Sequence, residues 1–467
     1  MTSVEALALR CLFPGFVGTT PPEWVRRRAA QGLGGIVLFG RNVETDAQVT
    51  RLTAALHTER PELVVAIDEE GGDVTRLEAK TGSSYPGNLA LGVAADPSLT
   101  TAVASALGGR LAGLGIDLNL APVADVNTNP LNPVIGVRSF GSDPRAVAQH
   151  TAAWITGMQG AGVAACAKHF PGHGDTSVDS HLALPVAGED PHVRALDPFR
   201  AAIDSGVRAI MSAHIAVPTI DEGPATLSSK LMTGLLRDEL GFQGVAVTDG
   251  LEMRGLAERH GLGDRAVLAL AAGCDGLCVG GGLCDEGVVD EIVAAITAAV
   301  ERGRLTEGRL AEAATRVGAL ASPFKEKQIA DRRDGDEIGL EAARRAIRAD
   351  GAVRVGGDVA VIRFEPPASI AAGDVPWGAA TALARRGVRV VETVTEVAGK
   401  DLVIVVRDLH RQPENRLQVD ALLSRRPDAV VVEMGVPVCR PQAAKAYIAT
   451  HGSARVCADA AAELMTG

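Results

Sequence analysis

The chain has 467 residues, with 46 basic and 57 acidic side chains, a formal net charge of −11 and 46% hydrophobic residues. This balance is typical of a globular protein and excludes a disordered or collagen-like chain. The excess of acid argues against a nucleic-acid partner or an anionic membrane surface. Because the length exceeds a single core of about 250–300 residues, we expect two domains.

The N-terminal segment has neither the basic region nor the cleavage site of a signal peptide, and no stretch approaches 18 uninterrupted apolar residues. Seven cysteines, an odd number, are typical of reduced thiols. The spacing of Cys274, Cys278 and Cys284 matches no recognised zinc or iron–sulfur motif. We therefore predict a cytoplasmic protein, without a membrane partner, that is a monomer or a homodimer.

Short apolar runs alternate with helical segments along the first two thirds of the chain. The runs lie at 12–18, 34–39, 63–68, 116–126, 163–170, 208–215, 244–249 and 275–281. Strands that alternate with helices predict a parallel sheet with helical crossovers. About eight such units favour an α/β fold, a TIM-like (β/α)8 barrel over residues 1–322. The main alternative is a doubly wound open sheet, but no GxGxxG motif follows an early strand.

A charged stretch at 323–337 interrupts this alternation and is predicted to be a linker. A second series then follows, with helices at 338–349 and 415–426 and strands at 358–364, 389–394, 401–408, 429–435 and 454–458. It predicts a smaller α/β sandwich domain over residues 338–467. Since this domain has no cluster of His, Cys or acidic residues, its role stays unassigned and we favour a scaffold.

The segment KHFPGHGDTSVDSH (168–181) concentrates three His, two Asp and one Lys after a strand-like run. The carboxyl ends of barrel strands face the active site, so we expect Lys168 and His169 there and the remainder in the following loop. Other apolar runs also end in ionisable residues, namely Asp68, Asp125, His214 and Asp249. Because a carboxylate is rarely buried in a core unless it is paired, these residues predict one shared site.

One chemistry for this site is metal-dependent hydrolysis. His169 and His173 are four residues apart, and nearby acids could complete a metal site. However, Pro171 and Gly172 break any helix that would bring the two histidines onto one face.

The other chemistry is covalent glycosyl transfer, which needs a nucleophilic carboxylate and a proton donor that later acts as a base. Asp249, at the end of a strand, suits the nucleophile. A His braced by Asp on a loop suits the acid/base, because His titrates near neutral pH.

The segment KHFPGHGDTSVDSHLALP (168–185) resembles the signature of the β-N-acetylglucosaminidase (β-N-acetylhexosaminidase) branch of glycoside hydrolase family 3. Further matches, in the family's order, are IDEEGGDVTRL (67–77), NLAPVADVNTNPLNPVIGVRSFGSDP (119–144), RAIMSAHIAVP (208–218) and VTDGLEMRGL (247–256). The resemblance implies that Asp249 is the nucleophile and that His181, paired with Asp179, is the general acid/base. It implies sugar-binding roles for Asp68, Arg76, Arg138, Lys168 and His169, and we include His214 among the substrate-binding candidates.

The implied reaction is retaining hydrolysis of a terminal β-linked N-acetylglucosamine, without a metal or other cofactor. The expected substrates are small carbohydrates, namely N-acetylglucosaminides and muropeptide fragments. A neutral His base does not repel phosphate, so a phosphorylase that yields the sugar 1-phosphate is the alternative. A barrel that binds carbohydrate without turnover is a remote alternative.

The sequence departs from the family's pattern at three positions near these candidates. Gly250 follows Asp249 where Asp or Ala is common. Val137 precedes Arg138 where the family usually has an acid, so we expect Arg138 to lack that brace. Asp73 stands where Arg is frequent.

Overall fold

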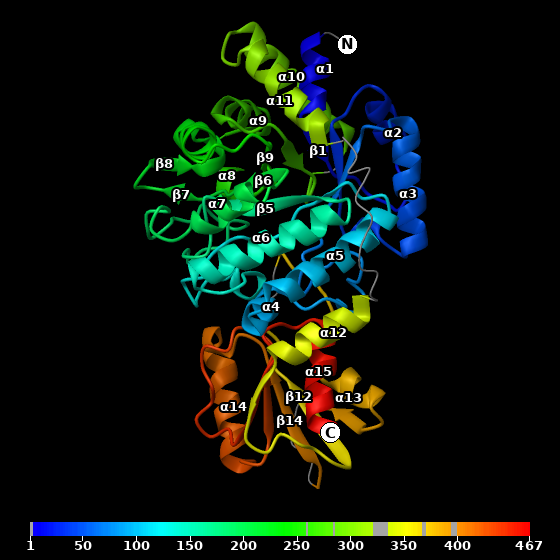
Figure 1. The fold of residues 1–467 in the computed structure, drawn as a ribbon, viewed down its shortest axis with the longest axis vertical. Coiled ribbons are helices and arrows are strands. Elements are labelled where there is room, and N and C mark those ends of the chain that lie inside the picture. Colours follow the sequence, from blue (N-terminus) through cyan, green and yellow to red (C-terminus); the bar gives the residue numbers. More distant parts are fainter. Residues whose placement is uncertain (1–2, 258–259, 284, 321–334, 367–369, 394–398) are drawn as a thin grey trace.

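The computed structural model describes residues 3–257, 260–283, 285–320, 335–366, 370–393 and 399–467, which form two α/β units stacked end to end (Figure 1). Most of the predicted linker at 323–337 lies outside the described residues, and its last three residues begin helix α12.

The N-terminal unit is a barrel of parallel strands, which confirms the predicted TIM-like fold. Strands β2, β3, β4, β5, β6 and β9 form a continuous sheet in that order, a bridge between Val247 and Gly276 leads to β10, and β10 pairs with β1. Each strand falls within one of the predicted apolar runs. The strands are β1 (Leu12–Pro14), β2 (Gly35–Leu38), β3 (Val64–Ile67), β4 (Leu118–Asn119), β5 (Ala164–Phe170), β6 (Ala209–Ser212), β9 (Val245–Thr248) and β10 (Leu277–Val279).

Helices follow the strands and cover the outside of the barrel (Figure 1). Asp96 and Asp143 accept hydrogen bonds from the first backbone N–H groups of α5 and α6, and a proline opens each helix. The helices are α1 (Ser3–Arg10), α2 (Glu23–Ala30), α3 (Asp46–Glu59), α4 (Asn88–Ala94), α5 (Pro97–Gly113), α6 (Pro144–Gly160), α7 (Asp197–Asp204), η4 (Lys230–Glu239), α8 (Arg254–Ala257), α9 (Leu262–Ala272), α10 (Glu286–Glu301) and α11 (Glu307–Leu320).

The barrel interior is a packed apolar core. Phe13, Val37, Leu118, Met211 and Val247 belong to one buried cluster contributed by different strands. A second buried cluster, to which helices and strands both contribute, fills the space between the barrel and its outer helices. Because the interior is filled with side chains, ligands reach only the ends of the barrel.

The C-terminal unit is an α/β sandwich. Its sheet has the order β11-β16-β15-β14-β12-β13, and only β11 is antiparallel. Alternate residues of the central strands pack against α13 and α15 on one face and against α14 on the other. The elements are α12 (Gly335–Ala346), β11 (Arg348–Asp350), β12 (Asp358–Arg363), α13 (Ala380–Arg385), β13 (Arg389–Glu392), β14 (Asp401–Val406), α14 (Pro413–Arg425), β15 (Val430–Glu433), β16 (Ala446–Ala449) and α15 (Arg455–Thr466).

Two predicted elements of this unit are wrong. The run at 454–458, predicted as a strand, begins helix α15, because it continues into an alanine-rich segment of strong helix formers. The last strand is instead β16, whose sequence AYIA was not recognised. The predicted helix at 338–349 ends at Ala346, and Arg348–Asp350 is the edge strand β11.

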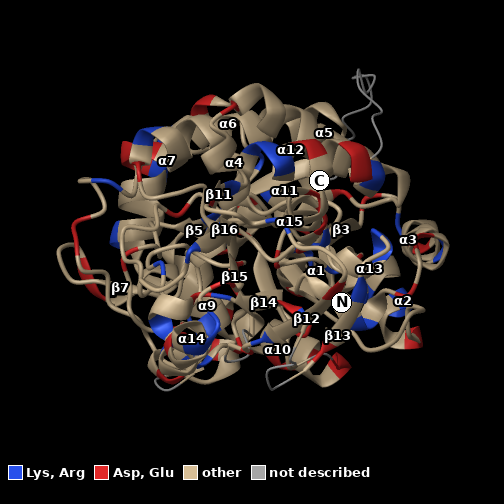
Figure 2. Ribbon diagram, turned by 90° about the horizontal axis from the view of Figure 1, so that it is seen from below, with Lys and Arg blue, Asp and Glu red and all other residues tan. Residues whose placement is uncertain are grey.

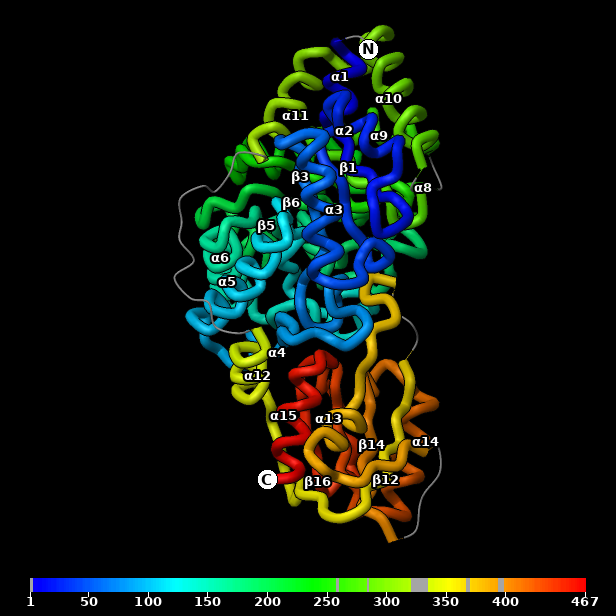
Figure 3. Tube along the Cα trace, turned by 90° about the vertical axis from the view of Figure 1, so that its right-hand side faces the viewer, coloured from blue at the N-terminus to red at the C-terminus, as the bar shows by residue number. Residues whose placement is uncertain are grey.

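The carboxyl ends of the second sheet face the barrel. Arg407, which follows β14, pairs with Asp73 of the barrel, and Ser453 donates from its backbone N–H and its hydroxyl to the same carboxylate. The segment that follows β12 rises toward the barrel as the gold tube in Figure 3. This segment leaves the sheet between β12 and β14, where the strand order reverses, which is where open α/β sheets commonly bind ligands.

Acidic and basic residues are interspersed over the helices when the molecule is viewed from the C-terminal unit (Figure 2). No helix among the described residues is long and apolar enough to cross a membrane.

Candidate active site

A cavity of about 580 Å³ lies at the carboxyl ends of the barrel strands. It brings together most of the predicted site residues. Those that line it are Asp68, Arg76, Arg138, Lys168, His169, His181 and Asp249. Asp179 and His214 are not among the lining residues. Asp179 is hydrogen-bonded to His181, and His214 is hydrogen-bonded to the carbonyl of Gly250.

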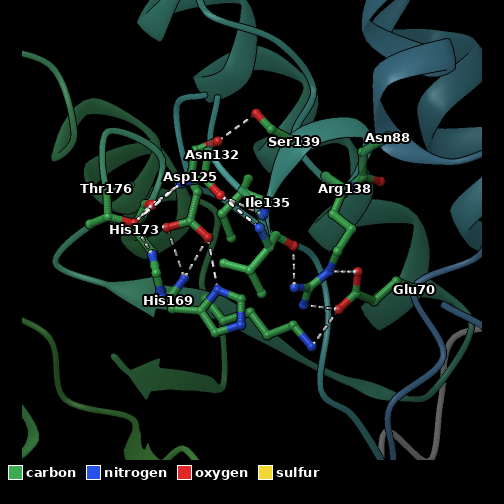
Figure 4. Close-up of polar contacts among 12 residues, drawn as sticks. Glu70, Asn88, Asp125, Asn132, Ile135, Arg138, Ser139, His169, His173 and Thr176 are labelled. Carbon is green, nitrogen blue, oxygen red and sulfur yellow. Dashed lines mark hydrogen bonds and ion pairs between the residues drawn. The ribbon is translucent and has the colours of Figure 1, made fainter. Parts of the chain in front are cut away.

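Glu70, which sequence reasoning missed, is the centre of a buried ion-pair network. Its carboxylate accepts two hydrogen bonds from the Arg138 guanidinium, at 2.9 and 2.7 Å, and lies 2.7 Å from the Lys168 Nζ (Figure 4). Glu70 therefore supplies the brace that Val137 does not, and the expectation that Arg138 lacks one is wrong. Glu70 lies two residues after Asp68, but no local pattern in the sequence links it to Arg138, which is 68 residues away.

Asp68 joins the same network from the end of β3. Its two oxygens accept hydrogen bonds from the Lys168 ammonium, at 2.5 Å, and from Arg76 Nη2, at 2.8 Å. Burial alone would raise the pKa of Asp68, but the charges of Lys168 and Arg76 outweigh it and lower that pKa. The carboxylate is therefore ionised at neutral pH and presents a charged acceptor to the cavity.

Arg138 is held in place by its own loop. The Asn132 side chain accepts hydrogen bonds from the backbone N–H groups of Val134 and Ile135, which shapes the turn that leads to Arg138. Arg138 Nη1 also donates to the Val134 carbonyl, at 2.9 Å. Because all three guanidinium nitrogens are hydrogen-bonded, the Arg138 side chain is held in one orientation in the cavity wall.

Asp125 orients the histidine at the end of β5. Its carboxylate is completely buried and accepts hydrogen bonds from His169 Nδ1, at 2.7 Å, and from the backbone N–H of His173, also at 2.7 Å (Figure 4). Burial raises the pKa of Asp125, but its interaction and hydrogen bond with the His169 ring outweigh that effect, so the pKa is lowered. Because Nδ1 of His169 is used in this way, Nε2 remains for a ligand in the cavity.

His173 is a structural partner of the same loop. Its Nδ1 lies 2.6 Å from Thr176 Oγ1, and Asn132 donates to its backbone carbonyl. Burial lowers the pKa of His173 to about 4, so this ring is neutral at physiological pH.

The predicted acid/base pair forms a local hydrogen-bonded turn. Asp179 Oδ1 accepts hydrogen bonds from His181 Nδ1, at 2.7 Å, and from the His181 backbone N–H, at 2.9 Å. Burial lowers the pKa of His181, but the bond to Asp179 and the charge of Asp249 outweigh it, so the pKa is raised above 6.5. Because Nδ1 of His181 is hydrogen-bonded to Asp179, its Nε2 remains for a ligand in the cavity.

Asp249 follows β9 and faces the same cavity. Its Oδ1 accepts a hydrogen bond of 2.8 Å from the Gly250 N–H. Burial would raise the pKa of Asp249, but the surrounding histidines, His214 first and then His169 and His181, outweigh it and lower that pKa. An ionised carboxylate and a histidine of raised pKa thus line one cavity, which is the pairing that acid-assisted nucleophilic substitution requires.

His214 differs from the expectation that it contacts substrate. It is completely buried, its Nδ1 lies 2.8 Å from Thr226 Oγ1, and its Nε2 donates to the Gly250 carbonyl at 2.9 Å. Both ring nitrogens are therefore occupied by the protein. His214 holds the backbone next to Asp249, which is a positioning role.

The second domain supplies part of the cavity wall, through residues 370–375. The carbonyl oxygen of Ala371 accepts a hydrogen bond of 3.0 Å from Arg76 Nη2, the same nitrogen that pairs with Asp68. The second domain is therefore more than the scaffold that we favoured, because its backbone also orients Arg76, a predicted sugar-binding residue. Within the described part of the chain, no group of three or more His, Cys, Asp or Glu side chains is arranged to hold a metal ion.

Comparison with known proteins agrees with this geometry. Residues 21–320 match the N-terminal domain of glycosyl hydrolase family 3. The chain is 36% identical over 330 residues to β-hexosaminidase A of Pseudoalteromonas piscicida, covering 65% of this chain and 55% of that protein. It is 40% identical over 255 residues to a β-hexosaminidase of Alkalilimnicola ehrlichii, covering 52% of this chain and 72% of the relative.

Among solved structures, a glycoside hydrolase family 3 β-N-acetylglucosaminidase from Paenibacillus sp. str. FPU-7 superposes with a TM-score of 0.90 at 33% identity. That superposition covers all of this chain and 97% of the other, so the likeness includes both domains. The chain therefore belongs to glycosyl hydrolase family 3.

Proposed function

We propose that this protein is a retaining glycosidase that removes a terminal β-linked N-acetylglucosamine through a glycosyl-aspartate intermediate. The observation that carries the proposal is the shared cavity of Asp249, an ionised carboxylate, and His181, a histidine braced by Asp179. A retaining mechanism needs one nucleophile and one acid/base, and these residues supply one of each.

In the first step, His181 donates a proton to the glycosidic oxygen while the Asp249 carboxylate attacks C1 of the sugar. The bond from C1 to the glycosidic oxygen breaks, and an ester bond from C1 to Asp249 forms. The lowered pKa of Asp249 keeps the nucleophile ionised, and the raised pKa of His181 favours the protonated form of the acid.

In the second step, His181 is neutral and takes a proton from water, whose oxygen attacks C1. The ester bond to Asp249 breaks, the sugar leaves with its original anomeric configuration, and His181 is protonated again. Asp179 accepts from Nδ1 throughout, which keeps the tautomer and orientation of the ring suited to proton transfer at Nε2.

Sugar recognition is proposed for the charged residues at the base of the cavity. Asp68, Lys168 and Arg138 present charged donors and acceptors on rigid strand ends or braced loops, and His169 presents Nε2. Hydroxyl groups both donate and accept, so this mixture suits a single sugar ring, and charge-assisted hydrogen bonds are the strong ones. The names of the relatives favour N-acetylglucosamine as that sugar, and muropeptide fragments as larger substrates follow from the family resemblance.

A fluorinated N-acetylglucosaminide that traps the glycosyl-enzyme tests the proposal. We expect the label on the peptide that contains Asp249, and none in an Asp249→Asn variant. A label on another residue would overturn the assignment of the nucleophile. A panel of p-nitrophenyl N-acetylglucosaminide, glucoside and galactoside, together with muropeptide fragments, tests the sugar and the aglycone.

Phosphorolysis is the second candidate, because the acid/base is an imidazole and not a carboxylate. A neutral base does not repel an incoming phosphate, which would take the place of water in the second step. Product analysis with and without phosphate separates the two reactions, since phosphorolysis gives the sugar 1-phosphate.

A further inference from the structure

A second cavity, of about 550 Å³, lies at the junction of the two domains. Two chain segments line both cavities in turn. In one segment Ala79 lines the catalytic cavity and Lys80 lines the second cavity, and in the other Val375 and Pro376 do the same. Lys80 and Thr81 come from the barrel, whereas the rest of the lining comes from the C-terminal unit.

The charged residues that line this cavity all have the same sign. They are Lys80, Arg385 and Arg455, and no Asp or Glu is among the lining residues. Over the helices of the molecule the two signs of charge are interspersed (Figure 2), whereas the charged side chains that line this cavity are all basic. The hydroxyl groups of Thr81 and Thr381 add neutral hydrogen-bond donors.

The acids that pair with these cations lie outside the lining. Arg385 pairs with Asp459 at 2.8 Å. Arg455 pairs with Asp336 at 2.6 Å and lies 3.7 Å from Asp459 and 3.8 Å from Glu78. A guanidinium carries five N–H donors, and Arg385 and Arg455 each donate one hydrogen bond to these acids, so both keep donors for a further ligand. Within the described ranges, no hydrogen bond or ion pair involves the Lys80 ammonium, and its side chain is exposed.

An aromatic ring forms another part of the wall. Trp377 is half-buried, and the guanidinium groups of Arg363 and Arg407 lie 5.3 and 5.9 Å from its ring centroid. Indole rings pack against the apolar face of sugar and aryl groups. The two guanidinium groups are paired with Glu365 and Asp73, so Trp377 contributes its apolar ring to the wall.

We propose that this cavity is a second ligand site, which binds a small phosphate-bearing anion between Lys80 of the barrel and Arg385 and Arg455 of the C-terminal unit. Arginine and lysine are the residues that bind phosphate oxygens best. Free phosphate and a sugar phosphate share this chemistry, and the Trp377 ring would contact the sugar of the latter. The site is independent of the proposed glycosidase reaction.

Binding at this site would join the two domains. The segments that contribute Lys80 and Trp377 also form the Arg76–Ala371 hydrogen bond at the edge of the catalytic cavity. An anion held by both segments binds the folded arrangement and not the unfolded chain, so it raises the unfolding temperature by mass action.

The test is titration of the full-length protein with inorganic phosphate and, separately, with glucose 6-phosphate, at ionic strength kept constant with sodium chloride. Trp377 is one of three tryptophans in the chain, so intrinsic fluorescence and the unfolding temperature both report binding. We expect saturable binding by the native protein, weakened about 10-fold or more in a Lys80→Gln/Arg385→Gln double variant, because two charged donors are lost.

Arg389→Gln is the matched control. Arg389 is an arginine of the same domain whose side chain is 80% exposed and which does not line the cavity, so this variant should bind as the native protein does. Saturating N-acetylglucosamine, which occupies the catalytic cavity under the proposed function, should leave phosphate binding unchanged. Tighter binding of glucose 6-phosphate than of phosphate would identify a sugar phosphate as the ligand, and equal binding would identify the phosphate group alone.

Three results would overturn the proposal. They are the absence of saturable binding, equal binding by the double variant and the native protein, and displacement of phosphate by N-acetylglucosamine. The last would place the anion in the catalytic cavity.

Discussion

Two turns of the barrel domain have the same local structure and different surroundings. In Asp179–His181 and in Asp190–His192, the aspartate Oδ1 accepts one hydrogen bond of 2.7 Å from the histidine Nδ1 and one of 2.9 Å from its backbone N–H. His181 lines the catalytic cavity with Asp249, whereas His192 is on the surface, with its Nε2 3.2 Å from Glu239.

The comparison shows that an Asp-x-His turn does not by itself make an acid/base. Both turns raise the pKa of their histidine through the bond to aspartate. What distinguishes His181 is a second carboxylate, that of Asp249, in the same cavity, together with the charged side chains of Asp68, Arg138 and Lys168. The predictions below use His192 and its partners as internal controls.

Replacement of the histidine should give the largest difference between the two turns. We expect His181→Ala to lower the rate on substrates with poor leaving groups by about 10²–10⁴, the usual contribution of general acid catalysis. A p-nitrophenyl substrate should lose less in the first step, because its leaving group needs no proton. Steady-state kinetics on an N-acetylglucosamine disaccharide and on the nitrophenyl substrate measure both effects.

His192→Ala is the matched control, since it removes the same turn from the surface, and its rates should equal those of the native enzyme. Equal losses on good and poor leaving groups in His181→Ala would contradict the acid role. A loss in His192→Ala as large as in His181→Ala would show that the turns act through folding and not through proton transfer.

Removal of a glutamate should have the next largest effect, on the free energy of unfolding. The two glutamates compared are Glu70, in the ion-pair network at the catalytic cavity, and Glu239, beside His192. Glu70 is 3% exposed and pairs with both Arg138 and Lys168, so Glu70→Ala leaves the buried Arg138 without its carboxylate partner and Lys168 with Asp68 alone. Breaking a buried pair in this way costs about 3–5 kcal/mol in the free energy of unfolding. Denaturant unfolding measures this loss.

Glu239, which faces His192, provides the control for this prediction. Its side chain is 47% exposed, so Glu239→Ala should cost no more than about 1 kcal/mol, as for other surface ion pairs. If Glu70→Ala unfolded with the same free energy as the native protein, the network would not be the rigid base of the cavity that we infer.

The sequence predicted the strand-end residues well because their positions follow from periodicity. Apolar runs end at Asp68, Lys168 and Asp249, and a parallel barrel brings the carboxyl ends of its strands together whatever the details of packing. The alternation of strand and helix predicted the barrel for the same reason. These features depend on local pattern and on one general rule of topology.

The residues that were missed depend on contacts between distant segments. Glu70 meets Arg138 across 68 residues, and the backbone of Ala371 meets Arg76 across 295 residues, so neither contact leaves a local pattern. His214 ends a strand like the others, but its ring points to Thr226 and Gly250, which periodicity does not reveal. The two Asp-x-His turns likewise could not be ranked by spacing alone.

The smallest effect should come from the aspartates of the two turns, through pH. The pKa of His181 is raised because the bond to Asp179 and the charge of Asp249 outweigh burial. The first step needs protonated His181, so kcat/KM of the native enzyme falls as the pH rises through that raised pKa. Asp179→Asn removes one of the two negative partners, and burial, which lowers the pKa, is then less opposed.

The alkaline limb of the pH profile should therefore move to lower pH in Asp179→Asn, and each unit of that shift is worth about 1.4 kcal/mol. Histidine NMR titration should show the same direction for the His181 ring. Asp190→Asn should lower the pKa of His192 but leave the pH profile of kcat/KM where it is, because that histidine is outside the cavity. An alkaline limb that stays fixed in Asp179→Asn while the His181 titration moves would assign the limb to another group, and the acid role would then pass from His181 to that group.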